Sequence, residues 1–275
     1  MKLNEMIQVA LELAGLDELP EDSAAIYDTG RDVRRVLAGI DGGAAELSIA
    51  HQLGFDCLAL HHPAGNIRTG VDDLYVRDHL KKMLECGVEP NHAWKLAESR
   101  REQMRHRSHS ANRDTVRGLA KLLDVAAVGL HTPADMLAER YVQQRMDALT
   151  AAKPLCTLRD VTEELMKIRE YREALGNQQP EIWAGTPDTY AGRIYVEMYG
   201  VGAPSAEEYI ACADAGVGTF ICMHVKEDVL AEVKKHGKAN IVVAGHMASD
   251  SLGFNQILDA WESRCVEVVR VNGIV

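Results

Sequence analysis

Short apolar runs separated by helix-length stretches are the feature that most constrains the fold of this chain. In the first half, an apolar run at residues 35–40 is followed by a helical stretch at 44–53 and by a second apolar run at 55–60. A strand, a helix and a strand in this order form a βαβ unit, in which the two strands are parallel. The sequence therefore predicts an α/β fold that contains parallel strands.

The same alternation extends over the rest of the chain. A long helical region at residues 71–123, broken near Gly87 and Pro90, leads into a strand-like run at 125–130 and a further helix from about residue 133. Later strands are predicted at residues 193–198, 217–223, 240–244 and 266–271, with helices between them at 205–215, 226–236 and 249–263. The pattern predicts two α/β halves with mixed or parallel sheets, residues 1–150 and 151–275, which join somewhere between residues 150 and 190.

Composition narrows the classes of function. No apolar stretch approaches the roughly 18 residues that span a bilayer, and the start of the chain is predicted to be an amphipathic helix rather than a signal peptide. The formal net charge of -11 disfavours binding to nucleic acid or anionic membranes. The basic cluster at residues 95–117 is interpreted as the solvated face of a helix, with an anion-steering or nucleic-acid-binding face as the alternative. Scattered cysteines without a C-x-x-C pair predict reduced thiols in the cytoplasm.

Three of the predicted strands are followed by side chains that can bind metals. In open α/β sheets, ligands gather at the carboxyl ends of the strands. Imidazole and carboxylate groups suit zinc, manganese or iron, and a bridging carboxylate allows two cations to lie close together. The residues concerned are His61 and His62, His131 and Asp135, and His246 and Asp250.

The spacing of these residues along the chain determines whether their side chains can point toward one site. Asp250 lies four residues after His246, so both side chains share one face if a helix has begun there. His61 and His62 are adjacent, and on an extended strand their side chains would point to opposite faces. A turn is therefore needed to bring them together, and Pro63 supplies part of it by restricting His62 to extended geometry.

Three segments resemble a known family. Residues 34–41, the helix after them, and the run Leu58-Ala59-Leu60-His61-His62-Pro63 resemble the Nif-three-like family, often labelled GTP cyclohydrolase type I, type 2 homologues. Residues 129–135, Gly-Leu-His-Thr-Pro-Ala-Asp, are similar to its His-Thr-Asn-Leu-Asp motif. Residues 244–250, Ala-Gly-His-Met-Ala-Ser-Asp, are similar to its Gly-His-x-x-x-Glu motif, and the three motifs keep the family order.

The resemblance implies two interlocked α/β subdomains with a dinuclear metal site in the cleft between them, often assembled into a hexameric ring. Carried over by position, the ligands of two divalent ions (zinc, manganese or iron) would be His61, His62, Asp135, His246 and Asp250. His131 would support a ligand or face the substrate. His224 lies where the family has an acid, and Asp250 replaces the family's glutamate.

Together these features predict a dinuclear metal-dependent hydrolase that acts on a small polar substrate such as a nucleotide. His131 and His224 are the candidate catalytic residues, because histidine gains and loses protons near neutral pH. The alternative is a ring-forming, metal-binding regulatory or scaffold protein without turnover. Both interpretations predict a cytoplasmic homo-oligomer, such as a homohexamer, that binds a small molecule and neither nucleic acid nor membrane.

Overall fold

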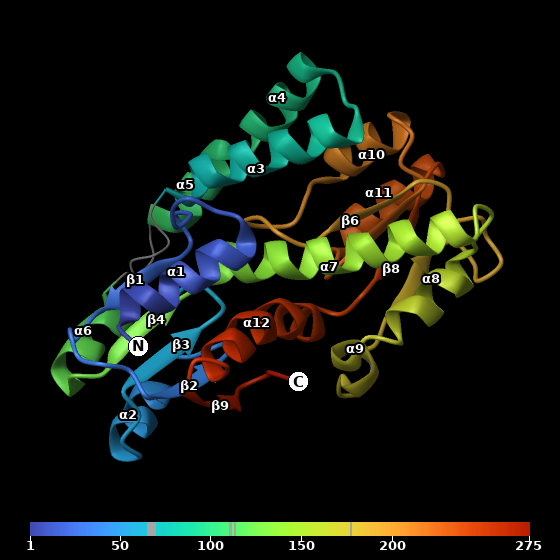
Figure 1. Ribbon diagram of the computed structural model, residues 1–275. Coiled ribbons are helices and arrows are strands. Elements are labelled where there is room, and N and C mark those ends of the chain that lie inside the picture. Colours follow the sequence, from blue (N-terminus) through green and yellow to red (C-terminus); the bar gives the residue numbers. More distant parts are fainter. Residues whose placement is uncertain (65–69, 110–111, 113, 177) are drawn as a thin grey trace. The chain divides into compact units, whose positions relative to one another are not determined.

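The computed structural model describes residues 1–64, 70–109, 112, 114–176 and 178–275 (Figure 1). The helices are α1 (Leu3–Ala14), α2 (Ala44–Gln52), α3 (Val71–Cys86), α4 (Pro90–Ser99), α5 (Arg101–His109), α6 (Thr115–Leu123), α7 (His131–Ala152), α8 (Leu158–Leu165), α9 (Arg169–Glu173), α10 (Ala206–Asp214), α11 (Glu227–His236) and α12 (His246–Glu262). The strands are β1 (Ala24–Tyr27), β2 (Arg35–Gly39), β3 (Cys57–Leu60), β4 (Ala126–Gly129), β5 (Glu181–Ala184), β6 (Ile194–Glu197), β7 (Thr219–Cys222), β8 (Asn240–Val243) and β9 (Glu267–Val271). They form two sheets with the orders β1-β4-β3-β2-β9 and β5-β8-β7-β6, which confirms the α/β class.

The chain forms two compact units, each built around one sheet. Unit 1 comprises residues 1–74, 103–137 and 250–274, and unit 2 comprises 75–102 and 138–249 with residue 275. The stretch between residues 150 and 190 separates β1–β4 from β5–β8, while β9, at the end of the chain, belongs to the first sheet. Two long helices change unit along their length: α7 begins in unit 1 and ends in unit 2, and α12 begins in unit 2 and ends in unit 1.

The central strands of unit 1 form the parallel arrangement that the sequence predicted. β2 pairs with β3 and β3 with β4, both parallel, and the register aligns Gly39, Leu60 and Gly129 across the three strands. Every residue of β3 and β4 is buried, as expected for parallel strands that are covered on both faces. Because these strands end level with one another, the residues that follow them meet at one edge of the sheet.

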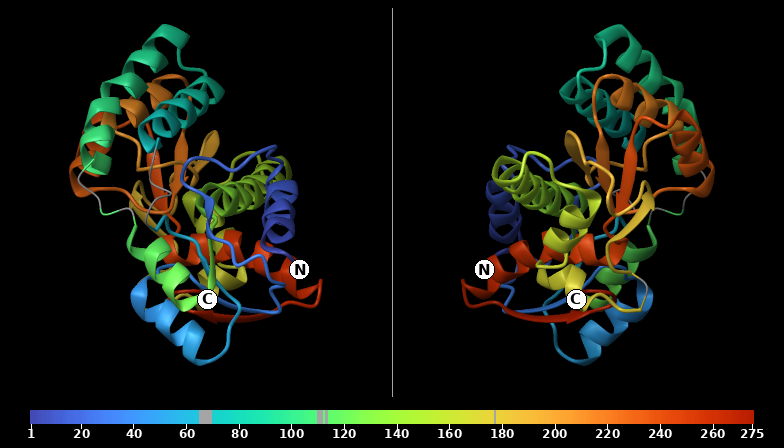
Figure 2. Two further views of the ribbon diagram at one scale, coloured as in Figure 1. Left: turned by 90° about the vertical axis from the view of Figure 1, so that its left-hand side faces the viewer. Right: turned by 90° about the vertical axis from the view of Figure 1, so that its right-hand side faces the viewer.

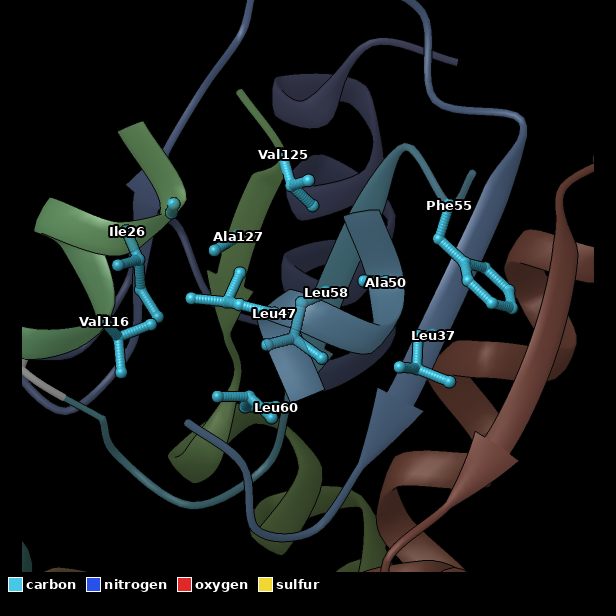
Figure 3. Packing of buried hydrophobic residues seen from close by; sticks show 11 residues of the cluster. Ile26, Leu37, Leu47, Ala50, Phe55, Leu58, Leu60, Val116, Val125 and Ala127 are labelled. Atoms are coloured by element: carbon cyan, nitrogen blue, oxygen red, sulfur yellow. The ribbon is translucent and has the colours of Figure 1, made fainter. Parts of the chain in front are cut away.

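Helices cover both faces of the first sheet. On one face, Leu47 of α2 and Val116 of α6 belong to a buried cluster that also contains Leu58 of β3 (Figure 3). Figure 2 shows α1 and α12 on the other face of this sheet from α2. There, the indole N–H of Trp261 in α12 donates a hydrogen bond of 3.0 Å to the carbonyl of Met6 in α1. This hydrogen bond attaches the C-terminal end of α12, about three turns after Asp250, to α1.

Unit 2 repeats the strand arrangement of unit 1. In each sheet the first strand (β1 or β5) lies antiparallel, with an irregular register, beside the last of three consecutive parallel strands (β4 or β8). In each case that last strand leads into a long helix that begins with histidine and carries aspartate four residues later: His131 and Asp135 in α7, His246 and Asp250 in α12. The repeat is one of topology, since the sequence shows no short internal repeat.

Both of these helices begin earlier than predicted. α7 was expected from residue 133 and α12 from residue 249, but they begin at His131 and His246. The backbone N–H of His131 donates to Ser23 Oγ at 3.0 Å, which satisfies a donor in the first turn. In α12 the backbone N–H of Ser249 already donates to the carbonyl of Gly245 at 3.1 Å. The condition for His246 and Asp250 to share a helix is therefore met.

The predicted helical region 71–123 consists of α3, α4, α5 and α6, and its predicted break near Gly87 and Pro90 lies between α3 and α4. Within the basic cluster, Arg113 lies outside the described residues. The six cysteines carry free thiols, as expected. None of the helices in the described part of the chain has the length and hydrophobicity needed to span a bilayer.

A buried ionic network in unit 2 joins α3 to the end of β6. Lys82 Nζ donates to Glu197 at 2.8 Å and to the carbonyl of Tyr199, and it lies 3.7 Å from a carboxylate oxygen of Glu139. Glu139 also accepts hydrogen bonds from the backbone N–H groups of Met198 and Tyr199, at 2.8 and 3.2 Å. Burial raises the pKa of Glu139 to about 7, although the charge of Lys82 opposes this shift.

We expect Glu139→Gln to change the pH dependence of stability. The Glu139 pKa is about 7 in the folded state against 4.5 ordinarily, so folding binds a proton between these values and the wild type loses stability as the pH rises through them. Glutamine keeps an acceptor oxygen but does not titrate. Urea unfolding at pH 5 and pH 8 should show the variant gaining roughly 2–3 kcal/mol relative to the wild type between the two. A stability difference that does not change with pH would contradict this assignment.

Candidate metal centre

The site of unit 1 is built at the carboxyl edge of the first sheet. His61 and His62 directly follow β3, and His131 begins α7 two residues after β4. The ladder of hydrogen bonds continues past the strand ends, because the N–H groups of His61 and His62 donate to the carbonyls of Gly39 and Ile40 at 3.1 and 2.9 Å. This pairing holds the backbone of the two histidines in place.

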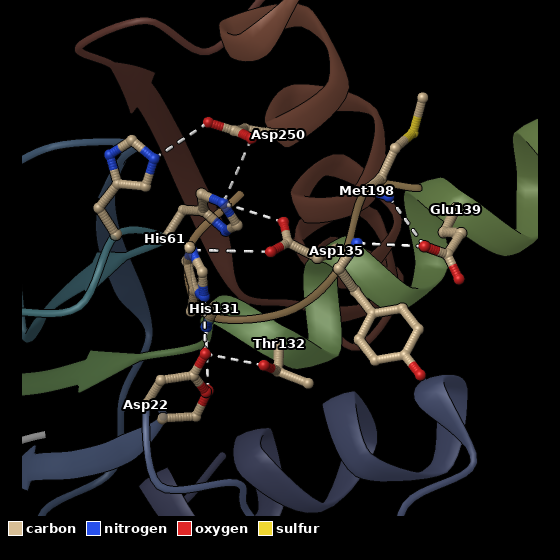
Figure 4. Close-up of polar contacts among 12 residues, drawn as sticks. Asp22, His61, His131, Thr132, Asp135, Glu139, Met198 and Asp250 are labelled. Atoms are coloured by element: carbon tan, nitrogen blue, oxygen red, sulfur yellow. Dashed lines mark hydrogen bonds and ion pairs between the residues drawn. The ribbon is translucent and has the colours of Figure 1, made fainter. Parts of the chain in front are cut away.

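The side chains at this edge form a row in which imidazole and carboxylate groups alternate (Figure 4). In order, the row consists of Asp22, His131, Asp135, His61, Asp250, His62 and Asp41. All seven residues belong to unit 1. The inner contacts of the row differ from the outer ones in distance and in hydrogen bonding.

At the centre of the row, His61 lies between two carboxylates. Its Nε2 is 3.3 Å from Asp135 Oδ1 and 3.5 Å from Asp250 Oδ1, and the three side chains are almost fully buried. Neither ring nitrogen of His61, nor Asp135 Oδ1, forms a hydrogen bond with any described residue. A buried polar group without a hydrogen bond costs about 1–3 kcal/mol, so these atoms require a partner of another kind.

The spacing of these atoms suits a shared cation. Two atoms bound at about 2.0–2.2 Å to one tetrahedral ion lie about 3.3–3.6 Å apart. The two separations from His61 Nε2 fall in this range, and ligand atoms of His61, Asp135 and Asp250 all lie within 4.8 Å of one another. The buried imidazole and carboxylate groups can therefore hold a metal ion.

Asp250 presents a different oxygen to each of the two adjacent histidines. Its Oδ1 faces His61 Nε2, and its Oδ2 lies 3.2 Å from His62 Nε2. The two imidazole rings are 5.1 Å apart and tilted by 42°, so the bend after β3 turns both side chains toward the same carboxylate. A carboxylate placed in this way can bridge two cations.

A further carboxylate holds each end of the row. Asp22 Oδ2 lies 2.7 Å from His131 Nδ1, and Asp41 Oδ1 lies 2.9 Å from His62 Nδ1. Asp22 is fully buried, whereas the Asp41 side chain is 72% exposed. In metal sites, a carboxylate on the far nitrogen of an imidazole orients the ring and makes it a better ligand.

Burial and charge act in opposite directions on the protonation of this row. Burial disfavours the charged form of His61, but the carboxylates of Asp250 and Asp135 outweigh it and hold the pKa of His61 well above its usual range. Burial alone would raise the pKa of Asp22, but hydrogen bonds from His131, Thr132 and Ser23 outweigh it and lower that pKa. Cationic partners for the inner carboxylates are thus electrostatically favoured.

The structure places the seven predicted site residues in two groups. His61, His62, Asp135 and Asp250 come together in unit 1, and His131 joins them there. His224 follows β7 and His246 follows β8 in unit 2, where their rings lie 4.7 Å apart. His246 is also one helical turn before Asp250 on α12.

Neither of the two outer carboxylates, Asp22 and Asp41, was among the predicted site residues. Asp41 follows the first predicted strand, so the rule that ligands gather at strand ends could have found it. Asp22 precedes β1, a strand of four residues at the sheet edge that was not predicted. Because β1 is antiparallel to β4 and pairs Ala24 with Gly129, its beginning lies at the edge where the parallel strands end. Asp22 therefore reaches the row from a segment that the sequence pattern did not assign.

No protein-family profile and no curated protein sequence matches the chain. Among solved structures, a NIF3 superfamily protein from Sphaerobacter thermophilus is 30% identical and has a TM-score of 0.92, over 99% of this chain and 98% of that one. Reduced HcgD from Methanocaldococcus jannaschii is 13% identical with a TM-score of 0.59, over 98% and 97% of the two chains. A Bacillus cereus protein related to NIF3 is 12% identical with a TM-score of 0.52, over 98% and 96%.

The two more distant structures establish the fold alone. The Sphaerobacter protein shares both sequence and structure with this chain over almost the whole length of each. This match agrees with the resemblance carried by the residues around His61, Asp135 and Asp250. The chain therefore belongs to the NIF3 superfamily.

Proposed function

We propose that the row of unit 1 is a dinuclear metal centre and that the protein hydrolyses a small polar substrate. The observation that carries this proposal is the buried Asp250 carboxylate, whose two oxygens face Nε2 of His61 and Nε2 of His62. Asp135 adds a second carboxylate on the other side of His61. His246, one turn before Asp250 on α12, is the remaining ligand that the family resemblance implies.

The donor set favours zinc, manganese or iron. Imidazole nitrogens and carboxylate oxygens suit these ions, and the site contains no thiolate that would select a softer one. Among the described residues, the groups that could hold a metal contain only histidines and aspartates and no cysteine. Two bound divalent cations would supply Lewis acidity, which activates water and polarises the bond under attack.

The polar residues around the row have separate tasks in this proposal. The Nδ1 atoms of His62 and His131 face outer carboxylates, so their Nε2 atoms face the centre of the row. His224 has an exposed side chain next to His246, where it is accessible to a substrate and can take up or release a proton. A nucleotide-like substrate is proposed on the family label alone.

We expect metal-free wild-type protein to bind about two zinc or manganese ions per chain, and His61→Ala to bind fewer. His61 contacts both inner carboxylates, so its removal takes a ligand from the centre of the row. Elemental analysis after metal loading and removal of excess ion measures the stoichiometry. Asp250→Asn should lower it as well, since a neutral amide bridges two cations poorly.

The control is His51→Ala, which removes an exposed histidine of α2 in the same unit. It should keep the wild-type stoichiometry. Circular dichroism checks that each variant is folded. Equal metal content in wild type, His61→Ala and Asp250→Asn would exclude the row as the metal site.

A hydrolysis screen separates the enzyme from a metal-binding scaffold. Metal-loaded protein should hydrolyse at least one member of a panel of phosphoesters, cyclic nucleotides and nucleoside triphosphates. Chelation should abolish this activity, and added metal should restore it. His224→Gln should lower the turnover rate while leaving the metal content unchanged, if His224 moves a proton. Two bound metals with no turnover on the whole panel would favour the regulatory or scaffold alternative.

A further inference from the structure

We propose that Asp22 positions His131 so that its Nε2 binds a cation held by Asp135, which makes His131 a metal ligand in addition to His61 and His62. This inference rests on the proposed metal centre but not on the hydrolytic activity. It assigns a role to a buried carboxylate and changes the role predicted for His131 from proton transfer to metal binding.

Asp22 accepts hydrogen bonds on both of its carboxylate oxygens. Its Oδ2 accepts from Thr132 Oγ1 at 2.7 Å and lies 2.7 Å from His131 Nδ1, and its Oδ1 accepts from Ser23 Oγ at 3.1 Å. Ser23 Oγ itself accepts from the backbone N–H of His131, so its own hydrogen is available for Asp22. The carboxylate therefore acts only as an acceptor.

The contact with Asp22 also decides which ring nitrogen of His131 carries the hydrogen. Because Asp22 offers no hydrogen, the hydrogen of the 2.7 Å contact belongs to His131 Nδ1. In the neutral ring the lone pair then lies on Nε2. The fully buried position of Asp22 and the stacking of the His131 ring on His61, with centroids 4.9 Å apart, hold this orientation.

The lone pair on His131 Nε2 is on the side of the ring that faces Asp135. His131 Nε2 lies 3.6 Å from Asp135 Oδ2, a separation within the range of about 3.3–3.6 Å expected for two ligands of one tetrahedral ion. The other oxygen of Asp135 faces His61. Ligand nitrogens of His61, His62 and His131 lie within 4.8 Å of one another. His131 thus has the same arrangement of partners as His62, with an outer carboxylate at Nδ1 and an inner carboxylate at Nε2.

Two measurements test the proposal without an activity assay. In metal-free, ¹⁵N-labelled protein, long-range ¹H–¹⁵N spectra should show neutral His131 as the Nδ1–H tautomer, with the signal assigned by its loss in His131→Gln. Zinc titration against a competing chelator should show a 10–100-fold weaker affinity in Asp22→Asn, the size of effect typical for loss of a carboxylate behind a ligand. The loss in His131→Gln should be at least as large.

The control is Asp56→Asn, in the same unit, where the carboxylate accepts hydrogen bonds only from the backbone of Arg34 and Arg35 among the contacts described. Its zinc affinity should equal that of the wild type. A His131 tautomer protonated at Nε2 would overturn the proposal, as would wild-type affinity in both Asp22→Asn and His131→Gln. Tight zinc binding without hydrolysis leaves the proposal standing and removes only the enzymatic one. If Asp22→Asn does not fold, the His131 tautomer in the wild type and the zinc affinity of His131→Gln still test the proposal.

Discussion

The burial of two carboxylates beside one imidazole is the constraint on which the candidate site depends. Asp135 and Asp250 lie on either side of His61, and all three are withdrawn from water. Carboxylates in such surroundings are expensive unless a positive charge accompanies them, and removal of that charge leaves an uncompensated group. A proton on His61 compensates one of the two charges, whereas divalent cations compensate both. The elevated pKa of His61 and the proposed metal centre are thus two responses to the same electrostatic demand.

The topology explains how distant residues reach this position. Parallel strands in register end at a common edge, which brings the residues after β3 and β4 together. An antiparallel strand beside them begins at the same edge, which adds Asp22. The repeated arrangement in unit 2 places His224 and His246 after its own parallel strands. Since α12 begins in unit 2 and continues into unit 1, one helix links His246 to Asp250 and so connects the two repeats by sequence.

The predictable part of the site is the part that depends on local pattern. His61, His62 and Asp135 follow strands whose apolar runs are unmistakable, and the spacing of His246 and Asp250 needs only a helix. The strands β1 and β5 escaped prediction because each has four residues at a sheet edge, where burial is incomplete and the apolar pattern is weak. The sequence pattern also did not predict which segments make up each unit. The pairing of β9 with β2 depends on contacts between residues far apart in the chain. Because β1 was not predicted, Asp22, which precedes this strand, was not recognised as a site residue.

Anomalous X-ray scattering at the zinc edge, from crystals of zinc-loaded protein, would show which of these side chains bind zinc. We expect two zinc positions that share the Asp250 carboxylate, one about 2.0–2.2 Å from His61 Nε2 and the other about the same distance from His62 Nε2. Density at these positions would establish the row as a dinuclear centre. Zinc bound only at other residues, with His61 still in direct contact with Asp135 and Asp250, would exclude the dinuclear centre and leave the row as a buried ionic network.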